Sequence, residues 1–212
     1  VGSEMCIRDR PLDVYTMLPS CVPATPFETS GFDLNSYDLS LLIDKPWVLG
    51  LAEMMNFPGV LNQDNNVMAK LELAKSRGKC IDGHAPYLHG KDLCAYIASG
   101  VKSDHECTTP DEAVEKLRLG MYVMVREGTA AKDLDALMPV LKTCNTRKCI
   151  LVTDDRHPAD LKEHINGMVR RAVEAGVDPV KAIQIASLNT AEYFGLKNLG
   201  AIAPGYKADL LI

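Results

Sequence analysis

The sequence lacks any excess of positive charge. Its 212 residues include 23 lysines and arginines against 28 aspartates and glutamates, a formal net charge of −5. This balance gives no general attraction for phosphate backbones or anionic membrane surfaces. The apolar runs are also short, and none approaches the roughly 20 residues that a membrane-spanning helix needs. We therefore expect neither a nucleic-acid partner nor a membrane partner.

Paired cysteines are missing as well. The seven cysteines are dispersed and contain no Cys-x-x-Cys pair, which argues against both a disulfide framework and a structural zinc site. We interpret them as small buried hydrophobic residues of a protein in the reducing cytoplasm. Apolar residues make up 47% and charged residues 24% of the chain, a composition typical of a soluble globular protein.

The first ten residues, VGSEMCIRDR, differ from the rest of the chain. They have no amphipathic period, and their mixed charges do not form a signal peptide. The string resembles a spurious leader that recurs in translated environmental sequences. We expect residues 1–10 to be an artefactual leader outside the fold.

From residue 11 onward, short apolar runs alternate with longer amphipathic ones. Short apolar runs are typical of strands covered on both faces in a parallel sheet. The third and fourth runs are weak in strand propensity and are placed by the rhythm. The predicted strands are Leu12–Leu18, Trp47–Met54, Lys79–Asp82, Val101–Ser103, Met121–Val125 and Cys149–Val152.

Helices are predicted between these strands. Thr109-Pro-Asp-Glu112 forms a capping box with proline at the first helical position, and this helix should run to Leu119. Pro139 should bend or end the helix that contains it. The other predicted helices are Asn65–Arg77, Lys91–Ala98, Ala131–Leu141, Pro158–Ala175 and one from Asp178 to about Phe194.

Strand–helix units in series predict a parallel α/β fold. The sequence has no glycine-rich phosphate loop, which weakens the doubly wound nucleotide-binding alternative. A (β/α)₈ TIM-type barrel has eight strand–helix units, whereas six strands are predicted here. We therefore expect residues 11–196 to form a partial barrel, about strands 3 to 8.

Polar residues stand at the ends of four predicted strands: Glu53, His84, His105 and Asp154. Catalytic groups of a barrel lie where strands end and the following loops begin. Imidazole and carboxylate together suit a divalent transition metal, which lowers the pKa of bound water. A lone His84 is more often a structural histidine and a lone Glu53 an ion-pair partner, but their recurrence at strand ends favours a metal site.

Other polar residues carry weaker signals. Asp155 is the alternative to Asp154 as a ligand, because the two are adjacent after the same strand. His157 either contacts the site or caps the helix beginning at Pro158, and His164 is expected to be solvated. His89 has no ligand-like spacing.

At these residues the chain resembles the bacterial adenine deaminases of the amidohydrolase superfamily. The resemblance covers residues 11–212, and the order and spacing of its motifs carry it. The matching stretches are PSCVPATPFETSG (19–31), GLAEMMNFPGV (50–60), IDGHAP (81–86), SDHE (103–106), EKLRLGMYVMVREG (115–128), VTDDRHPADL (152–161), AIQIASLNTAEYFGL (182–196) and GAIAPGYKADLLI (200–212).

The resemblance implies a role for each strand-end residue. Glu53 would bridge two metals, and His84 and His105 would be ligands after barrel strands five and six. Asp154 would bind metal and shuttle a proton from the attacking water. The metals would be Mn(II) or Fe(II), with zinc as a further alternative.

The implied reaction is hydrolytic deamination of adenine to hypoxanthine and ammonia, in which a metal-bound hydroxide attacks C6. Glu106, Arg126 and Glu127 are candidates for relaying protons or orienting the purine. Ion pairs that hold the histidines are an equally good interpretation of these three. The resemblance also implies a cytoplasmic homo-oligomer.

The chain departs from this family in two respects. It contains no His-x-His pair, which the family places after its first barrel strand, and only residues 197–212 match the start of its β-sandwich. We therefore expect a chain truncated at both ends, whose open barrel leaves it inactive. The alternatives are another amidohydrolase acting on a different purine or a cyclic amide, and a non-catalytic fragment. A smaller departure is Tyr87 with His89, in a loop where the family has small residues.

Overall fold

The computed structural model describes residues 12–25 and 27–210. The chain divides into two compact units, the first comprising residues 1–83 and 98–101 and the second residues 84–97 and 102–212. The leader expected at residues 1–10 lies outside the described residues. No helix in the described ranges is long and apolar enough to cross a membrane.

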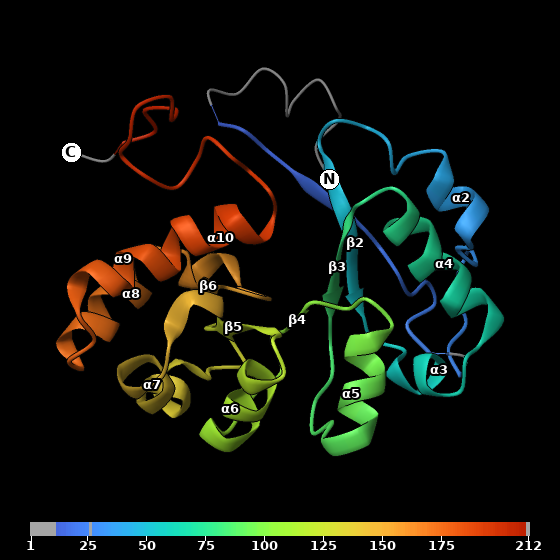
Figure 1. Cartoon of the computed structure of the whole chain (residues 1–212), viewed down its shortest axis with the longest axis horizontal. Helices are drawn as coiled ribbons and strands as arrows, with labels where there is room; N and C mark the ends of the chain where they lie inside the picture. Colours follow the sequence, from blue (N-terminus) through green and yellow to red (C-terminus); the bar gives the residue numbers. More distant parts are fainter. Residues whose placement is uncertain (1–11, 26, 211–212) are drawn as a thin grey trace. The chain divides into compact units, whose positions relative to one another are not determined.

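The first unit is built on a three-stranded parallel sheet in the order β1-β2-β3 (Figure 1). Its strands are β1 (Thr16–Leu18), β2 (Val48–Met54) and β3 (Cys80–Gly83). The helices are α2 (Ser36–Ser40), α3 (Phe57–Leu61) and α4 (Asn65–Ser76).

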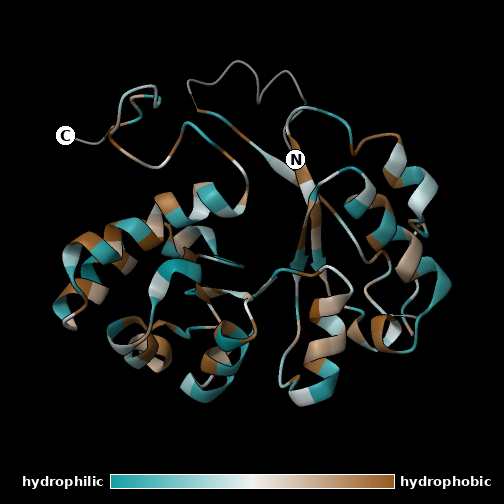
Figure 2. Cartoon of the chain, viewed as in Figure 1, coloured by the Kyte–Doolittle hydropathy of each residue, from teal (hydrophilic) through white to brown (hydrophobic). Residues whose placement is uncertain are grey.

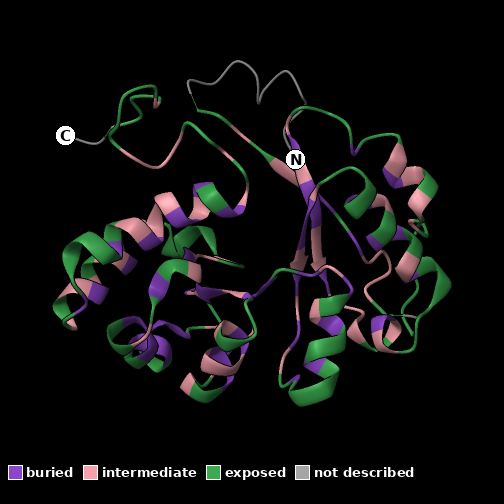
Figure 3. Ribbon diagram, viewed as in Figure 1, coloured by how far each residue is buried: buried purple, intermediate pink, exposed green. Residues whose placement is uncertain are grey.

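The core of the first unit lies between its sheet and α4. Leu51 and Ile81, which pair across β2 and β3, are buried, as is Leu71 on α4. The hydropathy colouring in Figure 2 and the burial colouring in Figure 3 show the same pattern, with apolar residues of the strands and the inner face of α4 withdrawn from solvent. This burial is the main stabilising contribution to the unit.

The second unit also contains a three-stranded parallel sheet, in the order β4-β5-β6. Its strands are β4 (Ser103–Asp104), β5 (Tyr122–Arg126) and β6 (Cys149–Val152). The helices are α5 (Gly90–Ala98), α6 (Pro110–Arg118), α7 (Leu134–Thr143), α8 (Ile165–Glu174), α9 (Pro179–Ala186) and α10 (Leu188–Tyr193), with short 3₁₀ turns at Thr146–Lys148 and Pro158–Asp160.

One continuous apolar core fills the second unit. It joins Val123 and Val125 of β5 and Leu151 of β6 to the buried faces of the helices, including Leu137 of α7 and Met168 of α8. β5 and β6 consist mainly of buried apolar residues, as predicted for strands of a parallel sheet, whereas β4 consists of the buried polar residues Ser103 and Asp104.

The α/β class and the parallel pairing are confirmed, and β6 has the predicted bounds. The first strand is shorter than predicted, because only Thr16–Leu18 pairs with β2. The fourth strand is Ser103–Asp104 rather than Val101–Ser103, and its two residues pair with β5. These differences arise because strand length depends on the neighbouring strand as well as on local apolarity.

Two predicted helices are interrupted. The segment Pro158–Ala175 is a single 3₁₀ turn followed by α8, which begins only at Ile165, because the backbone of His164 lies outside the helical region. The segment after Asp178 divides into α9 and α10 at Ser187, whose backbone leaves the helical region.

The helix containing Pro139 also differs from the prediction. It begins at Leu134, because the preceding residues form an antiparallel bridge between Glu127 and Lys132. It runs through Pro139 to Thr143, since Leu137 and Leu141 on its inner face are buried in the core.

The cysteines largely match their interpretation as core residues. Cys80, Cys107 and Cys149 are buried thiols, whereas Cys94 is exposed on α5. Burial raises the pKa of the Cys149 thiol to about 12, which keeps it protonated and unreactive. Residues 197–210 form turns, and the β-sandwich expected for this segment stays a prediction.

Candidate metal and catalytic site

Four of the predicted site residues stand at or just after the ends of strands. His84 follows β3 directly in the chain, His105 follows β4, Arg126 ends β5, and Asp154 comes two residues after β6. Because β4, β5 and β6 are parallel, their carboxyl ends share one edge of the sheet. Polar residues from the ends of these three successive strands therefore lie along this edge.

The two imidazoles lie beside each other and beside Glu106. The ring centroids of His84 and His105 are 5.2 Å apart in an edge-to-face arrangement. His84 Nδ1 is 3.6 Å and His105 Nε2 3.5 Å from the same carboxylate oxygen, Oε1 of Glu106. Both rings are partly buried, so the strand-end histidines converge on one half-buried acidic group.

Asp154 closes the same group of residues. His105, Glu106 and Asp154 each offer a ligand atom, and these atoms all lie within 4.8 Å of one another. The backbone of Asp154 has a φ of +53°, a left-handed conformation that is uncommon for a residue other than glycine. Asp155 instead donates its backbone N–H to Asp154 Oδ1 over 2.8 Å, which supports Asp154 as the residue facing the site.

Arg126 binds carboxylates on two sides. Its Nε donates to Asp133 Oδ2 over 2.7 Å, and its Nη1 contacts Glu106 and lies 3.3 Å from Asp154 Oδ2. Burial by itself would lower the pKa of Arg126, but the bonds to Asp133 and Glu106 raise it above the ordinary value. The guanidinium therefore stays charged and fixes the position of Glu106.

Glu127 faces away from this group toward α7 and α8. It is buried, its Oε1 pairs with Arg171, and its Oε2 accepts the backbone N–H of Leu134 over 3.3 Å. Glu127 therefore forms an ion pair, but with α8 and not with a group that holds the histidines, and its contact with a purine stays a prediction.

Glu53 belongs to the first unit. It is the penultimate residue of β2 and is half-buried, and its backbone carbonyl accepts a hydrogen bond from Ser20 Oγ at 2.5 Å. Its role as a metal ligand alongside the histidines of the second unit remains a proposal.

The weaker histidines have other partners. His157 Nδ1 accepts the N–H of Ala159 over 3.2 Å and so caps the 3₁₀ turn, one of its two expected roles. His89 Nδ1 lies 2.7 Å from Glu115 Oε2 at the surface. His164 is exposed before α8 rather than within a helix.

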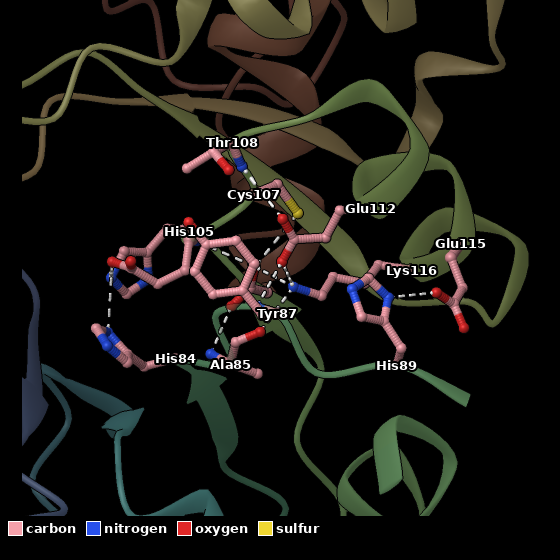
Figure 4. A network of polar contacts seen from close by, with 12 residues as sticks. His84, Ala85, Tyr87, His89, His105, Cys107, Thr108, Glu112, Glu115 and Lys116 are labelled. Carbon is pink, nitrogen blue, oxygen red and sulfur yellow. Dashed lines mark hydrogen bonds and ion pairs between the residues drawn. The ribbon is translucent and has the colours of Figure 1, made fainter. Parts of the chain in front are cut away.

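Sequence reasoning missed a buried ionic cluster of Asp104, Glu112 and Lys116, which is bonded to the residue that follows His84. Lys116 Nζ lies 2.8 Å from Asp104 Oδ2 and 2.7 Å from Glu112 Oε1, with both ion pairs almost fully buried (Figure 4). Burial opposes charge on Asp104, but the attraction and hydrogen bond of Lys116 outweigh it and hold the pKa of this carboxyl below its usual value. The available signal was the i,i+4 spacing of Glu112 and Lys116 on a helix that follows Asp104.

The cluster also corrects the predicted capping box. Thr109 Oγ1 accepts the N–H of Glu112 over 3.4 Å, so the threonine half of the box is present. The Glu112 carboxylate does not return to Thr109; its Oε1 binds Lys116, and its Oε2 accepts the N–H of Thr108 over 3.3 Å. The competing partner is a buried ammonium, which binds a carboxylate more strongly than a backbone amide does.

The donor set fits a divalent transition metal. Imidazole nitrogens and carboxylate oxygens suit zinc, iron or manganese, whereas thiolates, which would favour softer metals, are absent from the group of His105, Glu106 and Asp154. His105 and Glu106 are partly buried and Asp154 is exposed, and the close approach of the three donors is the geometry that a bound cation needs.

Residues 5–212 match the amidohydrolase family, and the chain belongs to this family. The curated relatives that it matches carry a more specific name. It is 55% identical over 204 residues to an adenine deaminase of Desulfatibacillum aliphaticivorans and 54% identical over 207 residues to one of Nitratidesulfovibrio vulgaris. These alignments cover 95% and 97% of this chain but 36% of each relative, so the chain spans about a third of their length.

Solved structures with a similar fold have low sequence identity. An N-acetylglucosamine-6-phosphate deacetylase from Pasteurella multocida has a TM-score of 0.64 at 12% identity, covering 95% of this chain and 63% of that one. A deacetylase of the same kind from Mycobacterium smegmatis has a TM-score of 0.63 at 14% identity, with coverage of 87% and 57%. At such identities the likeness concerns the fold alone.

Proposed function

We propose that the full-length protein hydrolyses adenine to hypoxanthine and ammonia in the cytoplasm. The observation that carries this proposal is the 55% identity, over nearly the whole chain, to a relative named adenine deaminase. The convergence of His84, His105 and Glu106 supports hydrolytic chemistry at that position. Loop contacts decide the substrate within a shared fold, and the alignment with this relative covers 95% of the chain, loops as well as strands.

The proposed metal ligands are Glu53, His84, His105 and Asp154, with Glu53 as the carboxylate shared by two metals. We propose that both metal ions are manganese(II) or iron(II). Zinc is the alternative, because the same donors can bind it. When bound, such metals would acidify a water molecule and so supply a nucleophile at neutral pH.

The protein side chains would handle protons and orientation. We assign Asp154 to accept the proton of the attacking water and Glu106 to deliver a proton to the ring nitrogen of adenine. Arg126 would hold Glu106 in place and orient the purine together with Glu127. Asp154 would then pass the proton taken from the water to the exocyclic nitrogen, which leaves C6 as ammonia. The proton of the C6 hydroxyl would return to Glu106 as the carbonyl of hypoxanthine forms.

The fold that supports this chemistry is proposed to be part of a (β/α)₈ barrel. Within each unit the parallel strands follow one another in chain order, without the reversal of order that marks a doubly wound sheet. Helices follow most of the strands in sequence. A sheet that grows in one direction in this way is typical of a barrel.

The test is an assay of the full-length protein reconstituted with manganese. We expect the protein to release ammonia from adenine. This activity should disappear when a chelator removes the metal and should return when manganese is added back. Guanine, cytosine and dihydroorotate serve as comparison substrates and should be turned over far more slowly. Absence of turnover of adenine in the metal-loaded protein would refute the proposal, and preferred turnover of another substrate would indicate a different amidohydrolase.

We further propose that the 212-residue chain by itself is inactive and binds metal weakly. It spans 36% of its adenine deaminase relatives, and no His-x-His pair is present in its sequence. A site with only part of its ligands would hold a cation loosely, because affinity depends on the number of donors.

A further inference from the structure

The buried cluster of Asp104, Glu112 and Lys116 lies entirely within the second unit and connects the segments that carry the two histidines. The ammonium of Lys116 has three donors, and the structure supplies three acceptors. Nζ lies 2.9 Å from the backbone oxygen of Ala85, 2.8 Å from Asp104 Oδ2 and 2.7 Å from Glu112 Oε1. Figure 4 shows the ammonium between the Glu112 carboxylate and the chain at Ala85.

Asp104 extends the connection through its two carboxylate oxygens. Oδ1 accepts the N–H of Ala85 over 2.7 Å, and Oδ2 accepts the N–H of Glu106 over 3.0 Å. Ala85 is the residue after His84, while Asp104 and Glu106 flank His105. One carboxylate therefore binds the backbone N–H of the residue that follows each of the two candidate ligands.

Glu112 secures the outer parts of the same two loops. Its Oε1 accepts the N–H of Tyr87 over 3.1 Å, and its Oε2 accepts the N–H of Thr108 over 3.3 Å. Tyr87 has a φ of +57°, so its loop has an uncommon backbone conformation that needs such support. The Tyr87 ring itself is exposed and contributes little to this arrangement.

Stability alone is a poor reason for this cluster. Buried ion pairs commonly cost as much in lost hydration as they return in attraction, and apolar residues of similar volume are often at least as stabilising. What a buried ammonium with fully used donors does provide is a single allowed arrangement of its neighbours. Here those neighbours are the loops after β3 and β4.

We infer that Lys116 is a positioning residue that sets the separation and orientation of the His84 and His105 rings for a divalent metal. This inference rests on the proposed function of the histidines as ligands, and it adds three residues, Asp104, Glu112 and Lys116, to the determinants of that site. Lys116 acts through Asp104 and Ala85 and touches neither imidazole. Supporting groups of this kind are worth about 10- to 100-fold in metal affinity or activity.

The experiment compares full-length variants for metal binding as well as turnover. Lys116→Met keeps the length of the side chain and removes the ammonium. Lys142→Met, which changes an exposed lysine of α7, is the matched control. The measurements are manganese(II) affinity and stoichiometry by electron paramagnetic resonance, and the visible absorption spectrum of the cobalt(II)-loaded protein, which reports ligand geometry.

We expect Lys116→Met to bind manganese about 10- to 100-fold more weakly and to shift the cobalt spectrum. Turnover should fall by a similar factor at saturating metal, with the KM for adenine little changed. Lys142→Met should match the wild type in all three measurements. Wild-type affinity and an unchanged cobalt spectrum in folded Lys116→Met would overturn the inference.

A second variant covers the case in which Lys116→Met does not fold. Glu112→Gln preserves volume and keeps one acceptor oxygen, for either the Tyr87 or the Thr108 amide, but replaces the other oxygen by an NH2 donor and removes one charge from the cluster. It should weaken manganese binding in the same direction by a smaller factor, and wild-type affinity would count against the inference. If the wild type binds metal but does not deaminate adenine, the proposed substrate fails, while the ratio of metal affinities still decides the role of Lys116.

Discussion

Single side chains in the candidate site serve two neighbours at once. Glu106 Oε1 stands 3.6 Å from His84 Nδ1 and 3.5 Å from His105 Nε2, and Arg126 binds Glu106 and Asp133 with different nitrogens. Such sharing makes the positions interdependent, because moving one group leaves another without its partner. Substitutions there should therefore be non-additive, as expected for residues in one hydrogen-bonded network.

Gly50 is a residue whose identity is dictated by a neighbouring strand. A Cβ at this position would lie 2.0 Å from the backbone oxygen of Cys80 in β3, which is far inside a permissible contact. Gly50→Ala should therefore force β2 and β3 apart and lower the stability of the full-length protein by at least about 1–3 kcal/mol, the usual cost of overpacking.

Chemical and thermal unfolding of the variant measure this effect. Gly31→Ala is the matched control, because nothing lies within 4 Å of the Cβ it would add. Its unfolding midpoint should stay near the wild-type value. Equal midpoints for the two variants would show that β2 and β3 do not approach as described.

At the scale of elements, helix starts depend on side-chain caps. Asp178 Oδ1 accepts the N–H of Lys181 over 3.0 Å at the beginning of α9, with proline in the first turn. α9 packs its buried Ala182 and Ile185 into the core of the second unit. The cap therefore fixes where this apolar face begins.

Asp178→Ala should lower the unfolding free energy of the full-length protein by about 1 kcal/mol, since it leaves the first turn without an acceptor. Asp178→Asn retains a capping oxygen and should cost much less. Urea unfolding of both variants provides the comparison. A loss of the same size in Asp178→Asn would attribute the effect to charge rather than to capping.

The helix boundaries show what local patterns can predict. Pro110–Arg118 begins where its capping residue Thr109 indicated, because that signal acts within one turn, and the helix predicted from Asn65 also begins there, with Asp64 as its cap. The break at Ser187 and the late start of α8 were not predicted, since the apolar period continues across both. They depend on how successive helices pack on the sheet, and that is a non-local condition.

At the scale of the whole molecule, the chain represents about a third of its relatives' length. The isolated 212-residue chain should release no measurable ammonia from adenine with manganese present, whereas the full-length protein should. The reason is the proposed sharing of the metal ligands between this chain and the rest of the full-length protein, since a site with fewer donors binds a cation more weakly. Metal analysis by mass spectrometry, run beside the ammonia assay, checks both statements. A full two-metal complement with turnover in the isolated chain would contradict the prediction.

The sequence indicated the polar residues at the strand ends, but not the buried ion pairs of Lys116 that support them. The candidate ligands stand at or just after the ends of strands, so order along the chain is enough to indicate one edge of a parallel sheet. The assignment of Glu112 to a capping box was half wrong, because the local motif could not show that Lys116 would compete for its carboxylate. Sequence spacing also could not distinguish the contacts of Glu127 from those of Glu106.

The sequence by itself determined the α/β class, the parallel pairing and the family. Apolar periodicity, strand-end polarity and motif order depend only on the order of residues along the chain. Only the tertiary structure decided which side chains share a partner. It placed Lys116 against Asp104 and Ala85, and both imidazoles against one oxygen of Glu106. The reason is that a buried charge selects its partners from whatever the fold brings within about 3 Å, and residues brought that close can be far apart in sequence.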